Sequence, residues 1–389
     1  MKENNKGIMQ NGALLLIAAV VLLAALVWTV GTIQERNIEN NAFDFTNFTN
    51  RAVLAVTDNT SHGEISVGHI EFISDNLYNR VAFSRQELFT ARWIVEELLS
   101  MGYTLDDIEV QEFTLDASRD NYLSEYMEIL PDTGISIVDI FFFVDEMPFV
   151  NMNLRSSQLS QNIILTVPGQ SQCDTFIVVG AHYDSVMYPG ASDNASGMAL
   201  LLESAQRMRY LDNYYTIIYA FFGAEEVGIL GAFYYVSTFS QENHDNLLFM
   251  VNADVLLEGP DLFYMAGYYD GIDEYMPAAN HITEAWDEIA KRVSIENDID
   301  LIAFPPGAFA PSDQLAFIYS YHTVINLAGL RTMPGWYDMH ITYAFFNMVT
   351  VLHSPQDNFQ YINQTWPGMI ETNMRGFSIF LEELLLASY

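Results

Sequence analysis

Imidazole and carboxylate side chains occur in this chain where apolar runs end. The runs at residues 175–181, 215–222 and 247–252 each lead directly, or after a short turn, into such side chains. One more aspartate stands in the loop behind the first run. The candidates are His182, Asp184, Asp193, Glu225, Glu226 and Asp254. Carboxylates crowded together raise one another's pKa unless a cation neutralises them, so this set points to a bound metal.

Zinc is the metal that suits this mixture of nitrogen and oxygen donors, and paired zinc ions commonly share a bridging carboxylate. The chain has a single cysteine, Cys173, which excludes a cysteine-based zinc site and an intrachain disulfide. A second imidazole is available in His353, which ends the apolar run 342–352 and precedes a proline turn. The remaining histidines lack comparable neighbours and are interpreted as surface or core residues: His62, His69, His244, His281, His322 and His340.

The elements that must position these side chains alternate along the chain. Apolar spacing predicts a helix over residues 87–102 and a strand over 108–115. Further strands are predicted at 135–144, 161–167, 175–181, 215–222 and 247–252, with helices over 197–210 and from about 228. This alternation predicts an α/β fold with a mainly parallel (mixed) central sheet and helices on both faces. The candidate side chains would then meet beyond the carboxyl ends of the strands, where loops converge.

The amino-terminal segment has a different character. Residues 12–33 read GALLLIAAVVLLAALVWTVGTI and carry no charge, which is long enough for a membrane-spanning helix. Lys2 and Lys6 precede the run, and the following chain is acidic, so the positive-inside bias places the short terminus in the cytoplasm. A cleaved signal peptide and a buried core helix are the alternatives, the second of them disfavoured so close to the terminus. The run is longer than a signal-peptide core, and no clear cleavage site follows, which favours an uncleaved anchor.

These features predict four regions. Residues 1–11 form a cytoplasmic tail, 12–33 a transmembrane signal anchor, 34–61 a polar spacer, and 62–389 an extracellular domain. The expected location is therefore the cell membrane, with a single pass. Half of the 389 residues are hydrophobic, which is enough for a sizeable core.

The net charge excludes one class of partner. With 50 acidic and 15 basic residues the formal charge is −35, so nucleic-acid phosphates would be repelled. The charge is interpreted first as a highly soluble, salt-adapted surface. As a secondary effect, an acidic cleft would attract a cation such as the free amine of a peptide.

Five short motifs occur in a characteristic order. They are Gly-Ala-His-Tyr-Asp-Ser at 180–185, Ala-Ser-Asp-Asn-Ala-Ser-Gly at 191–197, Ala-Glu-Glu-Val-Gly-Ile-Leu-Gly-Ala at 224–232, Asn-Ala-Asp at 252–254 and His-Ser-Pro-Gln-Asp at 353–357. In this order they resemble the dizinc exopeptidases typified by bacterial leucyl aminopeptidase. The resemblance extends from about residue 70 to the carboxyl terminus.

The resemblance implies a role for each candidate residue. His182 and Asp254 would hold one zinc ion, Glu226 and His353 the other, and Asp193 would bridge the two. Glu225 resembles the general base that takes a proton from the attacking water and passes it to the leaving amine. Asp184 resembles the acid that fixes the tautomer of the His182 ring, and Asp357 is expected to do the same near His353. The chain departs from the pattern at Gln314, where relatives often have a histidine.

The predicted activity is that of a zinc aminopeptidase acting on peptides with free N-termini, with a preference for an apolar first residue. The aromatic residues Tyr319, Tyr321, Trp336, Tyr343, Phe345 and Phe346 are expected to wall the pocket for that residue. The aromatic stretch 329–349 would otherwise form an interface or a surface near the membrane. Other functions remain open: a carboxypeptidase, for which Arg331 is the obvious cation, a glutaminyl cyclase, or a non-catalytic receptor-like ectodomain.

Overall fold

The computed structural model describes residues 56–57, 59–114, 159–171, 173–267, 280–304, 312–332 and 348–389. The described residues all belong to one compact unit. The predicted anchor at 12–33 and the predicted strand at 135–144 lie outside the described residues. Among the residues that are described, no helix is both long enough and apolar enough to cross a membrane.

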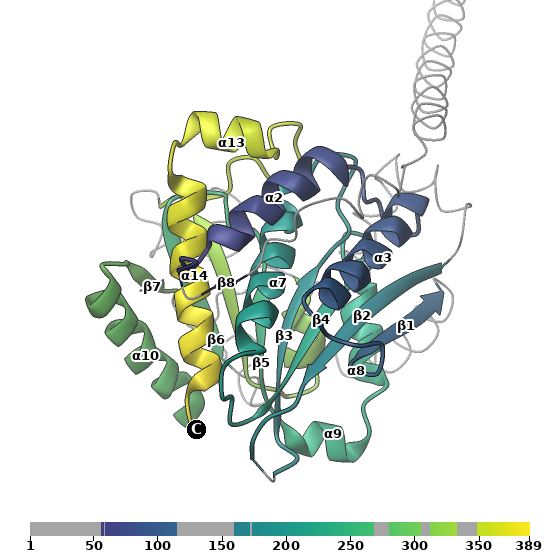
Figure 1. The fold of residues 1–389 in the computed structure, drawn as a ribbon, viewed down its shortest axis with the longest axis vertical. Coiled ribbons are helices and arrows are strands. Elements are labelled where there is room, and N and C mark those ends of the chain that lie inside the picture. The colour runs from purple at the N-terminus through teal and green to yellow at the C-terminus, as the bar shows by residue number, and fades with distance from the viewer. Residues whose placement is uncertain are drawn as a thin grey trace, which may run out of the picture. The chain divides into compact units, whose positions relative to one another are not determined.

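An eight-stranded sheet in the described part of the chain organises the fold, in the order β1-β2-β4-β3-β5-β8-β6-β7 (Figure 1). The strands are β1 Ile108–Thr114, β2 Leu159–Val167, β3 Phe176–His182, β4 Thr216–Phe222, β5 Leu247–Ala253, β6 Asp261–Gly267, β7 Leu301–Ala303 and β8 Val324–Leu330. The predicted strands at 108–115, 161–167, 175–181, 215–222 and 247–252 are thus present with small shifts at their ends.

The four central strands, β4, β3, β5 and β8, are mutually parallel. β2 runs antiparallel to both β4 and β1, and β6 runs antiparallel to β8 but parallel to β7. Every residue of β3 and of β8 is buried, as expected for strands covered on both faces. The sheet is therefore mixed, with a parallel centre, as predicted.

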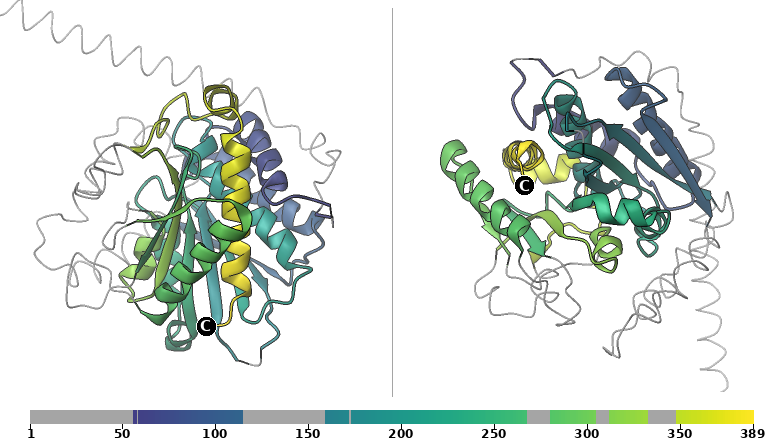
Figure 2. Two further views of the ribbon diagram at one scale, coloured as in Figure 1. Left: turned by 90° about the vertical axis from the view of Figure 1, so that its left-hand side faces the viewer. Right: turned by 90° about the horizontal axis from the view of Figure 1, so that it is seen from below.

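Helices cover both faces of this sheet (Figures 1 and 2). They are α2 Glu64–Asn76, α3 Arg85–Ser100, α7 Ser196–Met208, α8 Leu230–Ser237, α9 Gln241–Asn246, α10 His281–Asn297, α11 Gln314–Ile318, α13 Phe359–Thr365 and α14 Met369–Leu386. α7 is buried along its whole length, packed against β3 on one side and against α2 and α14 on the other. On the opposite face α8 and α11 pack Tyr235 and Phe317 against Phe222 of β4.

Candidate metal centre

The carboxyl ends of the parallel strands bring the candidate side chains to one edge of the sheet. β3 ends at His182, which pairs with Phe222 at the end of β4. β5 ends at Ala253, directly before Asp254. Asp193 comes from the short π-helical turn η2, Ala191–Ala195, between β3 and α7. Residues that are far apart in the sequence therefore converge because their strands run in the same direction.

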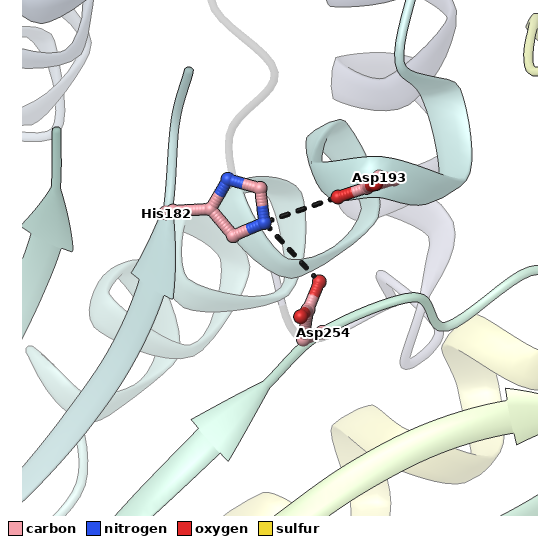
Figure 3. A group of neighbouring side chains, drawn as sticks. All are labelled: His182, Asp193 and Asp254. Carbon is pink, nitrogen blue, oxygen red and sulfur yellow. Dashed lines mark ion pairs between the residues drawn. The ribbon is translucent and has the colours of Figure 1, made fainter. Parts of the chain in front are cut away.

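The first group consists of His182, Asp193 and Asp254 (Figure 3). The Nε2 atom of His182 lies 3.1 Å from Oδ1 of Asp193 and 3.3 Å from Oδ1 of Asp254. The His182 side chain is only 1% exposed. A single ring nitrogen thus faces two carboxylate oxygens at the same time.

The second group consists of Asp193, Glu226 and His353. The Nε2 atom of His353 lies 3.1 Å from Oδ2 of Asp193 and 3.1 Å from Oε2 of Glu226. Asp193 therefore presents one oxygen to each imidazole, so that it links the two groups.

These separations fit zinc. Ligand atoms bound at ~2.0–2.1 Å around a tetrahedral ion lie ~3.3 Å from one another, and the observed nitrogen-to-oxygen separations are 3.1 to 3.3 Å. A protonated ring nitrogen donates its one hydrogen to one carboxylate, and an unprotonated ring nitrogen is itself an acceptor, whereas a cation placed between the atoms would satisfy all of them. The residues fit a zinc site at both groups.

The protonation of the site reflects this crowding of opposite charges. Burial by itself lowers the pKa of His182, but Asp254 and Glu225 outweigh it and raise that pKa well above its usual value. Burial also lowers the pKa of His353, yet Glu226 and Asp193 raise it to about 12. For Asp193 burial raises the pKa, and the two imidazoles lower it below the usual range. The carboxylates thus create a strong preference for positive charge at this edge.

Asp184 orients the turn that carries the two glutamates. Its Oδ1 accepts the backbone N–H of Glu225 at 3.0 Å, and its Oδ2 accepts that of Glu226 at 3.1 Å. Its carboxylate is 3.5 Å from Nδ1 of His182, while its backbone oxygen is 3.2 Å from that atom. Asp184 therefore lies beside the His182 ring, as the resemblance implies. It also holds the glutamate turn, which sequence reasoning missed.

Glu225 belongs to neither ligand group, although its neighbour Glu226 does. The side chain is partly buried, and burial is the main cause that raises its pKa well above the usual value. Asp313, Glu226 and Asp254 add to this increase, and His182 opposes it. A carboxylate with a raised pKa beside a metal site is suited to accepting a proton.

A buried glutamate on α3 also holds the turn that carries Glu225 and Glu226. Glu87 accepts the N–H of Ala224 at 3.0 Å and the hydroxyl of Ser160 at 2.7 Å. The backbone is strained at this edge, because Ala224 has φ 56°, Val255 has φ 51° and His353 has φ 52°. These three residues coincide with, or lie directly beside, the candidate site residues. Sequence reasoning did not identify Glu87, since no motif contains it.

Asp357 contacts a different part of the site from the one expected. Its carboxylate accepts the backbone N–H of Ser192 at 2.6 Å and that of Asp193 at 3.1 Å. It therefore anchors the turn that carries the bridging aspartate, rather than the His353 ring. The peptide bond after Asp193 is cis.

Arg80 is a second residue that the sequence did not reveal. Its fully buried guanidinium donates to the backbone oxygens of Tyr183 at 2.7 Å, Pro189 at 2.8 Å and Gly190 at 3.1 Å. Burial lowers its pKa to about 10, and the nearby carboxylates, Asp357 first among them, oppose that change. Arg80 therefore closes the loop between His182 and η2 and places a positive charge near the acidic site.

The segment at Gln314 is buried beside the site. Gln314, which stands where a histidine was expected from relatives, accepts a hydrogen bond from the side chain of Asn252 at 2.9 Å. Its neighbour Asp313 is fully buried, and neither of its carboxylate oxygens has a hydrogen-bond partner among the described residues. Burial is the main cause that raises the pKa of Asp313 well above the usual value, with Asp254 adding to it and His182 opposing it.

Part of the predicted aromatic pocket is wrong. Tyr321 directly precedes His322 and the start of β8, at the amino ends of the parallel strands, whereas the site lies at the carboxyl ends. Tyr319 stacks on Phe233 of α8. The other four residues of that pocket lie outside the described residues: Trp336, Tyr343, Phe345 and Phe346. Arg331, the cation required by the carboxypeptidase alternative, is exposed just after β8.

Comparisons with known proteins agree with this geometry. A family model described as Peptidase family M28 matches residues 162–378, more than half of the chain. Aminopeptidase YwaD from Bacillus subtilis is 40% identical over 89 residues, which cover 22% of this chain and only 20% of that relative.

Solved structures resemble almost the whole described fold. The zinc aminopeptidase BSAP from Bacillus subtilis superposes with a TM-score of 0.60 at 16% identity, covering 87% of this chain and 97% of the other. A glutaminyl cyclase from Fimbriiglobus ruber superposes with a TM-score of 0.57 at 12% identity, covering 87% and 100%. At these identities the likeness concerns the fold alone. The family match, however, covers the strands and loops that carry the site, and so the chain belongs to peptidase family M28, which confirms the predicted membership in a family of aminopeptidase-type metallopeptidases.

Proposed function

We propose that this protein is a zinc-dependent aminopeptidase that uses two zinc ions. The observation that carries the proposal is the position of Asp193, whose two oxygens face His182 and His353 separately at 3.1 Å. One ion would lie among His182, Asp193 and Asp254, the other among Asp193, Glu226 and His353. Bound zinc would supply the Lewis acidity that peptide hydrolysis requires.

The protein's own residues would supply the proton transfers and the geometry. Glu225 accepts the proton of the attacking water and delivers it to the leaving amine, because it lies in the same turn as Glu226 without joining a ligand group. Asp184 keeps this turn in place through the N–H groups of both glutamates. Glu225 would transfer the proton and Glu226 would bind the metal, and Asp184 holds the backbone of both. The backbone therefore sets the distance between the base and the metal.

The substrate we propose is a peptide with a free N-terminus. The excess of carboxylates at the site, to which the buried Asp313 adds, favours a cationic amine over a second carboxylate. A preference for an apolar first residue rests on the aromatic sequence between the end of β8 and His353, because both ends of this segment lie at the site edge. Each buried methylene of such a residue would add about 0.8 kcal/mol.

The experiment is a comparison of Leu-anilide with its N-acetylated form, using the purified domain with and without a chelator. We expect hydrolysis of the free amine, little action on the blocked form, and loss of activity on chelation that added zinc restores. Release of residues from the carboxyl end of peptides would overturn the proposal in favour of a carboxypeptidase. Cyclisation of N-terminal glutamine without hydrolysis would overturn it in favour of a glutaminyl cyclase.

We further propose that the protein remains anchored in the membrane with its catalytic domain outside the cell. The uncharged run at 12–33, preceded by Lys2 and Lys6, supports this proposal. Protease added to intact cells should release a soluble, active fragment cut within residues 34–59. An N-terminus that begins beyond residue 33 on protein recovered from the medium would show cleavage instead.

A further inference from the structure

The two histidines of the site differ in how they are held. His182 ends a central strand, and its side chain is 1% exposed. His353 lies in a turn with φ 52°, and its side chain is 42% exposed. Packing therefore fixes His182, whereas the position of His353 depends on what restrains the backbone beside it.

The side chain of Glu258 accepts hydrogen bonds from the backbone of residues 350–352, just before His353. Its Oε2 accepts three consecutive N–H groups, those of Thr350 at 2.5 Å, Val351 at 2.7 Å and Leu352 at 3.3 Å. The hydroxyl of Thr350 also donates to the backbone oxygen of Glu258 at 2.7 Å. Leu352 is the residue immediately before His353, so the restraint ends one residue before the ring.

Glu258 also comes from the other half of the site. It follows Asp254 by one short turn in the loop between β5 and β6, and it is fully buried. Its second oxygen, Oε1, has no hydrogen-bond partner among the described residues, whereas Oε2 accepts the N–H groups of the segment before His353. The hydroxyl of Ser192 is also close enough to oppose the rise that burial causes in the pKa of Glu258. A buried carboxylate with this bonding is placed to hold that segment in one conformation.

We propose that Glu258 is a positioning residue for His353, and that it determines the affinity of the second metal group without affecting the first. This inference rests on the proposed two-zinc function. Loss of groups that orient a metal ligand typically lowers metal affinity by about 10–100-fold. The decrease is expected only for the ion that His353 binds, because His182 and Asp254 are held by β3 and β5.

The test is a stepwise Zn²⁺ titration of the metal-free full-length protein in competition with a chromophoric chelator. Wild type should bind two ions. Glu258→Ala should weaken one step by about 10–100-fold and leave the other unchanged. Glu258→Gln retains an acceptor oxygen for the N–H groups and should recover part of the loss. Glu371→Gln, an exposed position in the first turn of α14, is the matched control and should behave as wild type.

Combining Glu258→Gln with His353→Ala distinguishes an effect on the position of His353 from a general loss of stability. The His353→Ala variant has already lost the second zinc-binding step. Adding Glu258→Gln should therefore leave the zinc affinity of the remaining step unchanged. Weaker zinc binding in the remaining step would overturn the inference. So would an unchanged zinc affinity of the second step in both Glu258→Ala and Glu258→Gln. If Glu258→Ala fails to fold, Glu258→Gln still decides between these outcomes. If wild type binds fewer than two ions, the proposed function itself is wrong, which is a distinguishable result.

Discussion

Replacing Glu225 by glutamine should lower kcat by ~10²–10⁴-fold while the zinc content stays that of the wild type. The amide has nearly the same shape as the carboxylate, but it cannot accept a proton. Glu225 belongs to neither ligand group, and its N–H bond to Asp184 comes from the backbone, which the substitution keeps. The substitution should therefore impair proton transfer without impairing metal binding.

The measurement combines steady-state kinetics on Leu-anilide with elemental analysis of the same preparation. Glu226→Gln is the informative contrast, because the adjacent glutamate faces His353 at 3.1 Å and its loss should reduce metal content as well as turnover. Normal turnover in Glu225→Gln would remove this residue from the mechanism. Loss of zinc in that variant would reassign it as a ligand.

Replacing Asp193 by alanine should have the largest effect on metal content, because both groups lose a ligand at once. Each imidazole would then face a single carboxylate, Asp254 for His182 and Glu226 for His353. Zinc bound by only two protein side chains lacks the three ligands that catalytic sites normally provide. We expect neither ion to survive dialysis, and activity to fall to background.

Asp254→Asn provides the control for this prediction, since Asp254 belongs to the first group only. This substitution should lower the affinity for one zinc ion and leave the affinity for the other unchanged. Zinc content measured after dialysis distinguishes the two variants. Retention of one tightly bound ion by Asp193→Ala would contradict the bridging role.

The strands and the residues that end them were predictable because both follow from local chemistry. The fully buried run of β3 stops at the first imidazole, and β5 stops directly before Asp254. Once the strands are parallel, their carboxyl ends must share an edge. The convergence of His182 with Asp254 thus needed no knowledge of side-chain packing.

The residues that hold the loops were not predictable in this way. Glu87 and Glu258 act on backbone N–H groups, which every residue except proline has, so their partners leave no trace in the sequence. Arg80 likewise bonds to carbonyl oxygens. The assignment of Tyr321 to the pocket failed for a related reason, because closeness in sequence to the late motifs does not reveal at which end of β8 a residue lies.

The carboxylates of Asp184, Asp357 and Glu258 each accept N–H groups of the main chain beside a candidate ligand. Such contacts do not depend on the identity of the residues that donate them. Replacing a residue that only donates its N–H should therefore preserve these contacts, whereas replacing an anchor should remove them. A designer who transplanted only the five donor residues to another scaffold would obtain the correct atoms on loops that have no reason to adopt the correct shape. The transferable unit is the set of ligands together with the acidic residues behind them.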